Sequence, residues 1–409
     1  MKKPYHIVLV TIADLPEGAG NTSRLRRLVQ ALSRCGHQVE IWNEHALGVS
    51  PPATQMPAGE IEGVPFSFVL GSVERGSGFG MIRTKYHAVR NLMARVKDRA
   101  RAGRLDVLWF NNLSYYDMQP LTSLARHLGV RTVQSYEDER LEVLDTGNRS
   151  LTNRLFALNS RLADRYLPKQ ADAIAVISDY LRRKYEPLAG SPDRLYLVPT
   201  IIDCDAWRCP EEVPTDVPSL LYSGSFSEQD EIENLIEALA VVKQSGRRFR
   251  MFMLGGNRRN SQAVEKARGL VAARGLADEV TMTGFVPLAE VRRHICQANL
   301  LINIRADGVW SRSGLSTKLS EYLASGRMVI TSDVGDVPVY LRDGESALFV
   351  SGAATVAEIA GAVDRALASP ELRRRVGEAG RAVALRHFDL PVVQETLQAM
   401  LDQVMKPRD

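Results

Sequence analysis

The sequence of 409 residues has few cysteines, and none of them forms a Cys-x-x-Cys pair. Their scattered positions give no metal-ligand spacing and no disulfide framework, which excludes a zinc module and a disulfide-stapled mini-protein. We therefore expect four reduced thiols without special chemistry. The four cysteines are Cys35, Cys204, Cys209 and Cys296.

Long apolar runs and a large excess of one charge are also missing. Stretches such as residues 7–12 and 173–177 are far shorter than the roughly 20 residues of a membrane-spanning helix. The first residues lack the apolar stretch and cleavage site of a signal peptide. The formal net charge of +4 gives no nucleic-acid footprint. We expect a cytoplasmic protein that does not bind nucleic acid.

What the sequence does contain is an ordinary globular composition, with 45% apolar and 24% charged residues. Continuous apolar, β-rich runs alternate with amphipathic helical patterns, which is typical of parallel sheets covered by helices on both faces. The predicted strands are residues 6–12, 38–42, 106–110, 131–136, 173–178, 195–199, 219–223, 249–254, 280–283, 300–304 and 328–332.

These eleven strands are more than one compact sheet usually holds, so we expect two doubly wound α/β sheets. The best boundary is the segment 199–203, which precedes a stretch rich in proline and acidic residues. We predict an N-terminal domain over residues 1–198 and a C-terminal domain over residues 203–385. A last helix at 388–404 belongs to a final segment, residues 386–409.

A glycine-rich turn follows the first predicted strand. It contains Gly18 and Gly20 and opens a helix that carries Arg24. Free backbone N–H groups and the positive end of the helix dipole would suit a phosphate there. Ser23 stands where the dinucleotide fingerprint has its third glycine, and no P-loop lysine follows. A plain turn explains these residues as well as a ligand loop does.

A second candidate site lies in the segment 312–326. Ser316 can cap a short helix with Thr317 and Lys318 in its first turn and Glu321 one turn further on. A lysine at a helix N-terminus opposes the helix dipole, and an anion bound there would explain it. The alternative is a surface lysine beside a solvated glutamate.

The order of several short motifs resembles the retaining GT-B glycosyltransferases of glycosyltransferase family four. The resemblance runs from about His6 to the C-terminus, and the ordered set is more specific than any of its pieces. The matching segments are Gly36-His37-Gln38-Val39, residues 170–178, residues 198–203, Leu235-Ile236-Glu237-Ala238, Thr283-Gly284-Phe285-Val286 and residues 321–326.

This resemblance implies two Rossmann-like domains that face a central cleft. The nucleotide-sugar donor would lie mainly on the C-terminal domain and the acceptor mainly on the N-terminal one. Residues 386–409 would form a helix that crosses back to the N-terminal domain. Transfer in such enzymes retains the anomeric configuration and needs neither a metal nor a cofactor besides the nucleotide sugar.

The resemblance also implies roles for single residues. Glu321 matches the carboxylate that accepts both ribose hydroxyls, and Phe285 and Val286 match the turn that holds the base. The residues that match the loop near the diphosphate are Gly18, Gly20 and Arg24.

The sequence departs from the family at three of its charged positions. The first predicted strand of the C-terminal domain is followed by a small-residue turn with Gly224, and the family's usual Arg and Lys after this strand appear as Ser225 and Asp230. Ser313 replaces the first glutamate of the Glu-x7-Glu motif. Two cations that would stabilise the leaving diphosphate are therefore missing, which should weaken catalysis unless others replace them. The available replacements are Lys318, Arg312 and Arg305.

In the N-terminal domain, Glu137 and Asp138 follow a predicted strand where the family often has His-Asp. Carboxylates at the carboxyl end of a strand could hold acceptor or donor-sugar hydroxyls, and together with Lys318 we take them as candidate catalytic residues. A solvated acidic turn is the alternative.

A basic segment lies between Arg83 and Arg104, with eight Lys or Arg residues and one acid. Its apolar residues recur every three or four positions, so we expect one face in the core and one cationic face. The core-facing residues would be Tyr86, Val89, Met93, Val96 and Ala100. The cationic face fits anionic lipid headgroups or a lipid-diphosphate acceptor, and a solvated basic face is the simpler interpretation.

We interpret the sequence as a retaining glycosyltransferase that moves a sugar from a nucleotide sugar to a glycan or lipid-linked acceptor. The expected role is bacterial surface polysaccharide assembly, in the cytoplasm at the inner face of the membrane. One alternative is a non-catalytic, nucleotide-binding partner subunit of the same fold, motivated by the missing cations. The other is a nucleotide-sugar epimerase.

Overall fold

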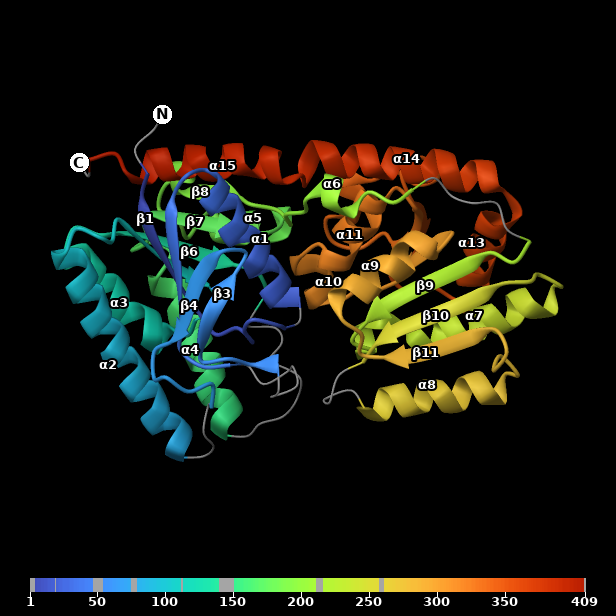
Figure 1. Ribbon diagram of the computed structural model, residues 1–409, viewed down its shortest axis with the longest axis horizontal. Coiled ribbons are helices and arrows are strands. Elements are labelled where there is room, and N and C mark those ends of the chain that lie inside the picture. Colours follow the sequence, from blue (N-terminus) through green and yellow to red (C-terminus); the bar gives the residue numbers. More distant parts are fainter. Residues whose placement is uncertain are drawn as a thin grey trace. The chain divides into compact units, whose positions relative to one another are not determined.

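The computed structural model describes residues 4–18, 20–46, 54–74, 79–111, 113–139, 151–210, 216–256 and 261–407. Their contacts divide the chain into two compact units. The first unit comprises Met1–Pro199 and Val393–Asp409, and the second comprises Thr200–Val392. Each unit has its own sheet with helices on its faces (Figure 1).

The sheet of the first unit has the strand order β3-β4-β2-β1-β5-β6-β7-β8. All its pairs are parallel except β3 with β4, which form an antiparallel hairpin at one edge. The strands are β1 (His6–Thr11), β2 (Gln38–Asn43), β3 (Ala58–Ile61), β4 (Val64–Phe68), β5 (Val107–Asn111), β6 (Arg131–Tyr136), β7 (Ala173–Val176) and β8 (Leu195–Leu197).

Helices cover this sheet because each presents an apolar stripe to it. On one face, Leu92, Leu121 and Leu167 pack against the β5 residues Leu108 and Phe110. The helices of this unit are α1 (Gly20–Arg34), α2 (Phe79–Arg101), α3 (Tyr115–His127), α4 (Leu151–Tyr166), α5 (Asp179–Tyr185) and the part of α15 (Leu390–Val404) from Val393 onward.

The sheet of the second unit is entirely parallel, with the order β11-β10-β9-β12-β13-β14. Its strands are continuous apolar runs, as expected for a sheet covered on both faces. They are β9 (Ser219–Gly224), β10 (Arg250–Gly255), β11 (Val280–Gly284), β12 (Leu300–Asn303), β13 (Met328–Ser332) and β14 (Leu348–Val350).

Two helical layers enclose the second sheet. One face is covered by α7 (Ile232–Gln244), α8 (Ser261–Ala273) and α13 (Val356–Ala368). The other is covered by α6 (Cys204–Trp207), α9 (Leu288–Gln297), α11 (Thr317–Ser325) and α14 (Pro370–His387). The short helices α10 (Val309–Ser313) and α12 (Val337–Tyr340) follow β12 and β13 in the chain.

The strand order reverses next to β9, because β10 lies on one side of it and β12 on the other. Open α/β sheets bind ligands at the carboxyl ends of strands at such a reversal. The same reversal occurs in the first unit at β1, which lies between β2 and β5. Among the helices that the structure describes, none has a stretch apolar enough to cross a bilayer.

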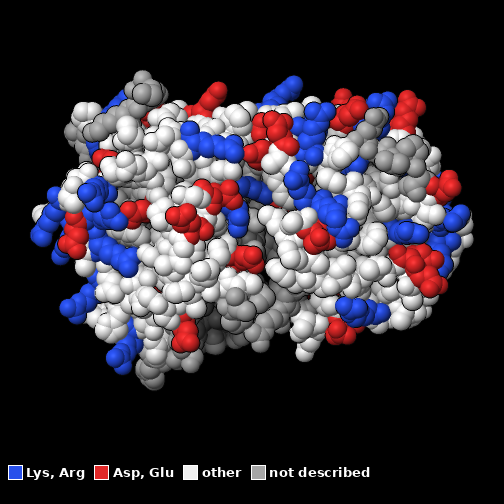
Figure 2. All heavy atoms as spheres, in the orientation of Figure 1, with Lys and Arg blue, Asp and Glu red and all other residues white. Residues whose placement is uncertain are grey.

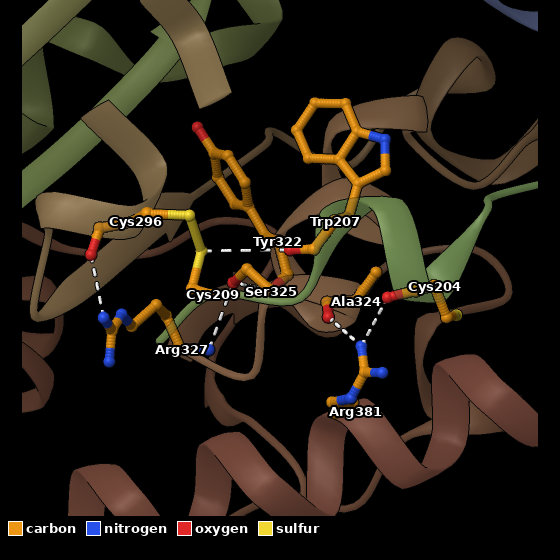
Figure 3. Close-up of a disulfide and its surroundings, with 9 residues drawn as sticks. All are labelled: Cys204, Trp207, Cys209, Cys296, Tyr322, Ala324, Ser325, Arg327 and Arg381. Atoms are coloured by element: carbon orange, nitrogen blue, oxygen red, sulfur yellow. Dashed lines mark hydrogen bonds between the residues drawn. A yellow bond between two sulfur atoms is a disulfide. The ribbon is translucent and has the colours of Figure 1, made fainter. Parts of the chain in front are cut away.

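The structure contradicts the expectation of four reduced thiols. Cys209 and Cys296 form a disulfide with a Cα–Cα distance of 5.1 Å (Figure 3). The backbone N–H of Cys209 donates to the Ser325 carbonyl, and the Arg327 guanidinium donates to the Cys296 carbonyl. Both cysteines are thus held beside the end of α11, a proximity that their separation of 87 residues does not reveal. The free cysteines are Cys35 and Cys204.

Candidate functional site

The carboxyl ends of β9 and β10 approach each other at a glycine cradle. The N–H of Gly256 donates to the Gly224 carbonyl at 2.8 Å. Gly255 has φ +103°, and a Cβ on it would lie 2.1 Å from the Gly224 oxygen. Only glycine fits at position 255, because any Cβ there would collide with the Gly224 carbonyl, so the two strand ends can approach closely. Sequence analysis missed Gly255 and Gly256, although a Gly-Gly pair directly after a predicted strand is a usable signal.

Lys318 reaches this cradle from the first turn of α11. Its Nζ lies 3.3 Å from Asp230 Oδ1 and 5.0 Å from the centre of the Tyr222 ring. A Cβ on Gly224 would lie 2.5 Å from the same Nζ. The Lys318 side chain is 24% exposed, so its ammonium is half-sheltered at the end of β9 and is not a solvated surface charge.

Asp230 is held by a tight turn between β9 and α7. Its Oδ2 accepts hydrogen bonds from the Ser227 N–H at 2.9 Å, from Ser227 Oγ at 2.8 Å and from Ser225 Oγ at 3.3 Å. Phe226 and Glu231, on either side of the turn, have φ of 57° and 48°. Non-glycine residues rarely adopt this left-handed region, so the surrounding contacts must fix the turn.

The electrostatics of this turn favour the ionised carboxylate. Burial alone would raise the pKa of Asp230, but the Lys318 ammonium, the Ser227 hydrogen bonds and the Arg305 charge outweigh it and lower the pKa to about 2. Burial, followed by the Asp230 charge, raises the pKa of Tyr222 well above its usual value. The site therefore presents an ion pair beside a neutral phenol.

Glu321 lies one turn after Lys318 in α11 and is buried. Ser316 occupies the N-cap position of this helix, but its hydroxyl makes no capping hydrogen bond. The Ser316 side chain therefore does not cap the helix, contrary to the expectation. Only the Ser316 carbonyl contacts the first turn, where it accepts a hydrogen bond from the Leu319 N–H. Thr317 is the first residue of α11, so the structure brings the predicted residues of this segment onto one helix.

The other predicted donor residues of the second unit are more spread out. Phe285 follows β11 and is 60% exposed, next to the partly buried Val286, so an aromatic face is available at this turn. Arg312 forms an ion pair of 2.7 Å with Asp307 on the surface. The Arg305 guanidinium instead donates to Oε1 of Gln229 at 2.6 Å, and Gln229 directly precedes Asp230 in the chain.

A small pocket with a mixed lining lies beside the start of α11, and its polar residues include Arg305, Ser316 and Asn303. The Asn303 amide donates to Thr331 Oγ1 at 3.1 Å, while its buried Oδ1 has no hydrogen-bond partner among the described residues. Ser313, in place of the family's first glutamate, is fully buried.

In the first unit, Arg24 and Glu137 form a buried ion pair. Arg24 Nε donates to Glu137 Oε1 at 2.7 Å, and Asn111 donates to the same oxygen at 2.8 Å. The two other guanidinium nitrogens of Arg24 donate to the carbonyls of Val198 and Pro199, both at 2.9 Å. Arg24 thus connects the start of α1 to Val198 and Pro199, where the first segment of this unit ends.

The glycine turn before α1 is tightly packed at Gly18. A Cβ on Gly18 would lie 2.0 Å from Thr22 Oγ1, which donates to the Asp14 carbonyl at 2.8 Å. Close packing therefore requires glycine at this position whether or not a ligand binds. Gly20 begins α1 and is exposed.

The acidic turn after β6 is not uniformly solvated. Asp138 is exposed, but Glu137 and Glu139 are buried, and Glu139 accepts a hydrogen bond from Lys184 at 2.5 Å. The alternative of a solvated acidic turn therefore holds for Asp138 alone.

A further carboxylate, which sequence analysis missed, follows β2. Glu44 is 1% exposed, and neither of its oxygens has a hydrogen-bond partner among the described residues. The nearest basic groups among the described residues are His45 Nδ1 at 3.5 Å and Lys85 Nζ at 3.9 Å, while Lys85 also pairs with Asp117 at 2.5 Å. A polar run directly after a predicted strand, Asn43-Glu44-His45, was the available signal.

The orientation of α2 differs in part from the expected one. Tyr86 is 65% exposed, whereas Val96 is buried as expected, in one stripe with Ala88 and Leu92. Two of the arginines also face the sheet: Arg95 donates to Ser67 Oγ at 2.9 Å, and Arg99 pairs with Glu40 at 2.7 Å. The exposed cations are Arg83, Arg90, Lys97, Arg101 and Arg104. Figure 2 shows blue side chains along the edge where α2 lies in Figure 1.

Within the part of the chain that the structure describes, no group of three or more His, Cys, Asp or Glu side chains could hold a metal ion.

Comparisons with known proteins match both units. Residues 203–383 match the family model for glycosyl transferases group 1, and residues 19–200 match that for the glycosyl transferase 4-like domain. A relative is alpha-D-kanosaminyltransferase of Streptomyces kanamyceticus, which is 29% identical over 293 residues, covering 69% of this chain and 71% of that protein.

Solved structures match nearly the whole chain. Sucrose-phosphate synthase from Thermosynechococcus elongatus has a TM-score of 0.73 at 19% identity, covering 98% of this chain and 99% of that one. HepE from Anabaena, solved with UDP and glucose, has a TM-score of 0.71 at 14% identity, covering 97% of this chain and 99% of that one. At these identities the structures establish the fold.

Proposed function

Because the chain belongs to the GT-B glycosyltransferases of the group 1 type, we propose that it transfers a sugar from a nucleotide-sugar donor with retention of anomeric configuration. The acceptor is a glycan or a lipid-linked glycan, and the role is bacterial surface polysaccharide assembly. The donor lies mainly on the second unit and the acceptor mainly on the first.

The observation that carries this proposal is the Lys318 ammonium at the glycine cradle of β9 and β10. Diphosphate oxygens are stabilised by a nearby cation, most strongly where that cation is sheltered from bulk water. Lys318 supplies such a cation although Ser225 and Asp230 stand where the family carries Arg and Lys.

The reaction needs charge stabilisation more than it needs a protein acid. As the bond between the sugar C1 and the diphosphate oxygen breaks, the acceptor oxygen bonds to C1 on the same face. The acceptor proton passes to the leaving diphosphate, so no metal and no cofactor enters this scheme. Lys318 faces the negative charge that grows on the leaving group, and Arg305 and Arg312 are the other candidate cations.

The remaining contacts follow from where the side chains lie. The buried Glu321 accepts the ribose hydroxyls, and the exposed Phe285 stacks on the base, with Val286 beside it. On the first unit, the exposed Asp138 contacts acceptor hydroxyls, while the neighbouring Glu137 is held by Arg24.

We also propose that α2 contacts an anionic membrane surface. Ile82 and Tyr86 are exposed by 63% and 65%, and Arg83 and Arg90 are exposed on the same helix. Exposed apolar side chains among cations are typical of surfaces that lie in the headgroup region.

A thermal-shift screen with uridine, guanosine and adenosine diphosphate sugars tests the donor class. A bound donor raises the melting temperature by mass action, so one nucleotide should stand out. Donor hydrolysis or transfer by the same protein excludes a non-catalytic subunit. Conversion of free donor to its epimer, with no acceptor present, would instead identify an epimerase.

A further inference from the structure

The glycine cradle holds a negative charge next to its cation. Lys318 and Arg305 contribute positive charge, while Asp230 is buried, ionised and in contact with Lys318. A carboxylate so close to a diphosphate site repels the ligand, so its presence there calls for a physical reason.

Asp230 is anchored more firmly than Lys318. Three donors from Ser225 and Ser227 fix one of its oxygens, and the left-handed Phe226 and Glu231 frame its turn. Its other oxygen is left to face Lys318 Nζ at 3.3 Å. The geometry is that of a fixed carboxylate and a movable ammonium.

A lysine ammonium sits on a flexible four-carbon stem and loses substantial rotamer freedom when it is held in one place. The absent side chain of Gly224 leaves room for the ammonium, and the Tyr222 ring lies below it at 5.0 Å. Among the residues in these contacts, Asp230 alone has a full negative charge that attracts the ammonium. Asp230 therefore sets the position of the ammonium.

We propose that Asp230 is a positioning residue that holds the Lys318 ammonium at the end of β9 for the leaving diphosphate of a nucleoside diphosphate sugar. This inference rests on the proposed function. Asp230 weakens ground-state attraction to the diphosphate, while the pre-placed ammonium acts on the charge that develops in the transition state. Interactions made only in the transition state raise turnover without tightening donor binding.

The test is a double-mutant cycle of Asp230→Asn, Lys318→Met and the double variant. Turnover of the donor identified by thermal shift is measured together with the dissociation constant of its nucleoside diphosphate. Asp230→Asn should lower turnover about tenfold without weakening nucleoside diphosphate binding, because the repulsion is lost with the anchor. In the Lys318→Met background the same change should alter turnover by less than about twofold, because coupled residues are not additive.

Equal effects of Asp230→Asn in both backgrounds would overturn the inference, since they would show that Asp230 acts independently of Lys318. A matched control is Asp364→Asn, which removes an exposed partner of Arg247 far from these residues in the chain and should leave turnover unchanged. If Asp230→Asn does not fold, Ser227→Ala loosens the same anchor and should lower turnover only when Lys318 is present. A wild-type protein that neither binds a nucleoside diphosphate nor turns over donor would instead contradict the proposed function.

Discussion

Arg24 and Glu137 are 113 residues apart in the sequence and form an ion pair of 2.7 Å in which both side chains are 6% exposed. The pair joins the start of α1 to the carboxyl end of β6. Because Arg24 also donates to the last two carbonyls of the continuous first segment of this unit, one side chain fixes three segments at the edge of the sheet.

Glu137→Gln should destabilise the first unit strongly. It leaves the Arg24 charge buried without its counter-ion, which typically costs about 3 to 5 kcal/mol. Urea unfolding measures the loss. The control is Glu62→Gln, whose exposed pair with Arg26 is worth less than about 1 kcal/mol. A Glu137→Gln variant as stable as this control would refute the anchoring role.

Asp230 should make stability depend on pH in the acid range. Its pKa is lowered to about 2 in the folded protein, so its contribution is complete above the usual value near 4 and is lost as the pH falls toward 2. The complete contribution, present above pH 4, amounts to about 2 kcal/mol. Unfolding of wild type and Asp230→Asn at pH 6, 4 and 3 measures it. The gap between the two proteins should narrow as the pH falls, and a constant gap would contradict the lowered pKa.

The disulfide determines how many free thiols a thiol titration should find. Denatured protein purified without reductant should show two thiols, from Cys35 and Cys204, and four after reduction. Cys209→Ser should lower unfolding free energy by about 2 to 5 kcal/mol, because the bond constrains a long loop in the unfolded chain. The count also bears on location, since disulfides are rare in the cytosol. Four thiols without reductant would contradict the bond.

The exposed face of α2 should bind anionic vesicles in a salt-dependent way. Gln substitutions at Arg83, Arg90 and Lys97 should release the protein from phosphatidylglycerol vesicles, because exposed charges provide the attraction. Gln at Arg95 and Arg99 is the matched control, since these arginines face the sheet. Co-sedimentation at rising salt measures binding. Equal binding to neutral vesicles would rule out electrostatic attachment.

Much of the fold follows from hydrophobic patterning. Each of the eleven predicted strands overlaps an observed one, because strands buried on both faces give continuous apolar runs. The missed strands β3 and β4 form an edge hairpin in which burial alternates along β4, and Pro65 weakens the strand signal there. β14 has three residues, too few for any pattern.

The candidate sites were less accessible to sequence reasoning. Helical spacing located α2 but did not decide which of two overlapping stripes faces the core, so Tyr86 was placed wrongly. The ion pair of Lys318 with Asp230 and the disulfide join residues 88 and 87 positions apart, and such contacts depend on the strand order. Comparison with the family's motifs drew attention to Asp230 only because it stands where the family carries a lysine.

Lys318 and Glu321 give the most direct test of the account, because they lie three residues apart on one helix and have different proposed roles. Glu321→Ala should mainly weaken donor binding, since the ribose contact exists in both ground and transition states. Lys318→Met should lower turnover about a hundredfold to a thousandfold with little change in donor affinity, since it opposes charge that develops during bond breaking.

The decisive measurement is therefore steady-state donor turnover by Lys318→Met, set beside equilibrium donor binding by the same protein. The account predicts a large loss of turnover with binding within about threefold of wild type, because Lys318 acts mainly in the transition state. Near-normal turnover of Lys318→Met would contradict the claim that this ammonium replaces the missing diphosphate cations.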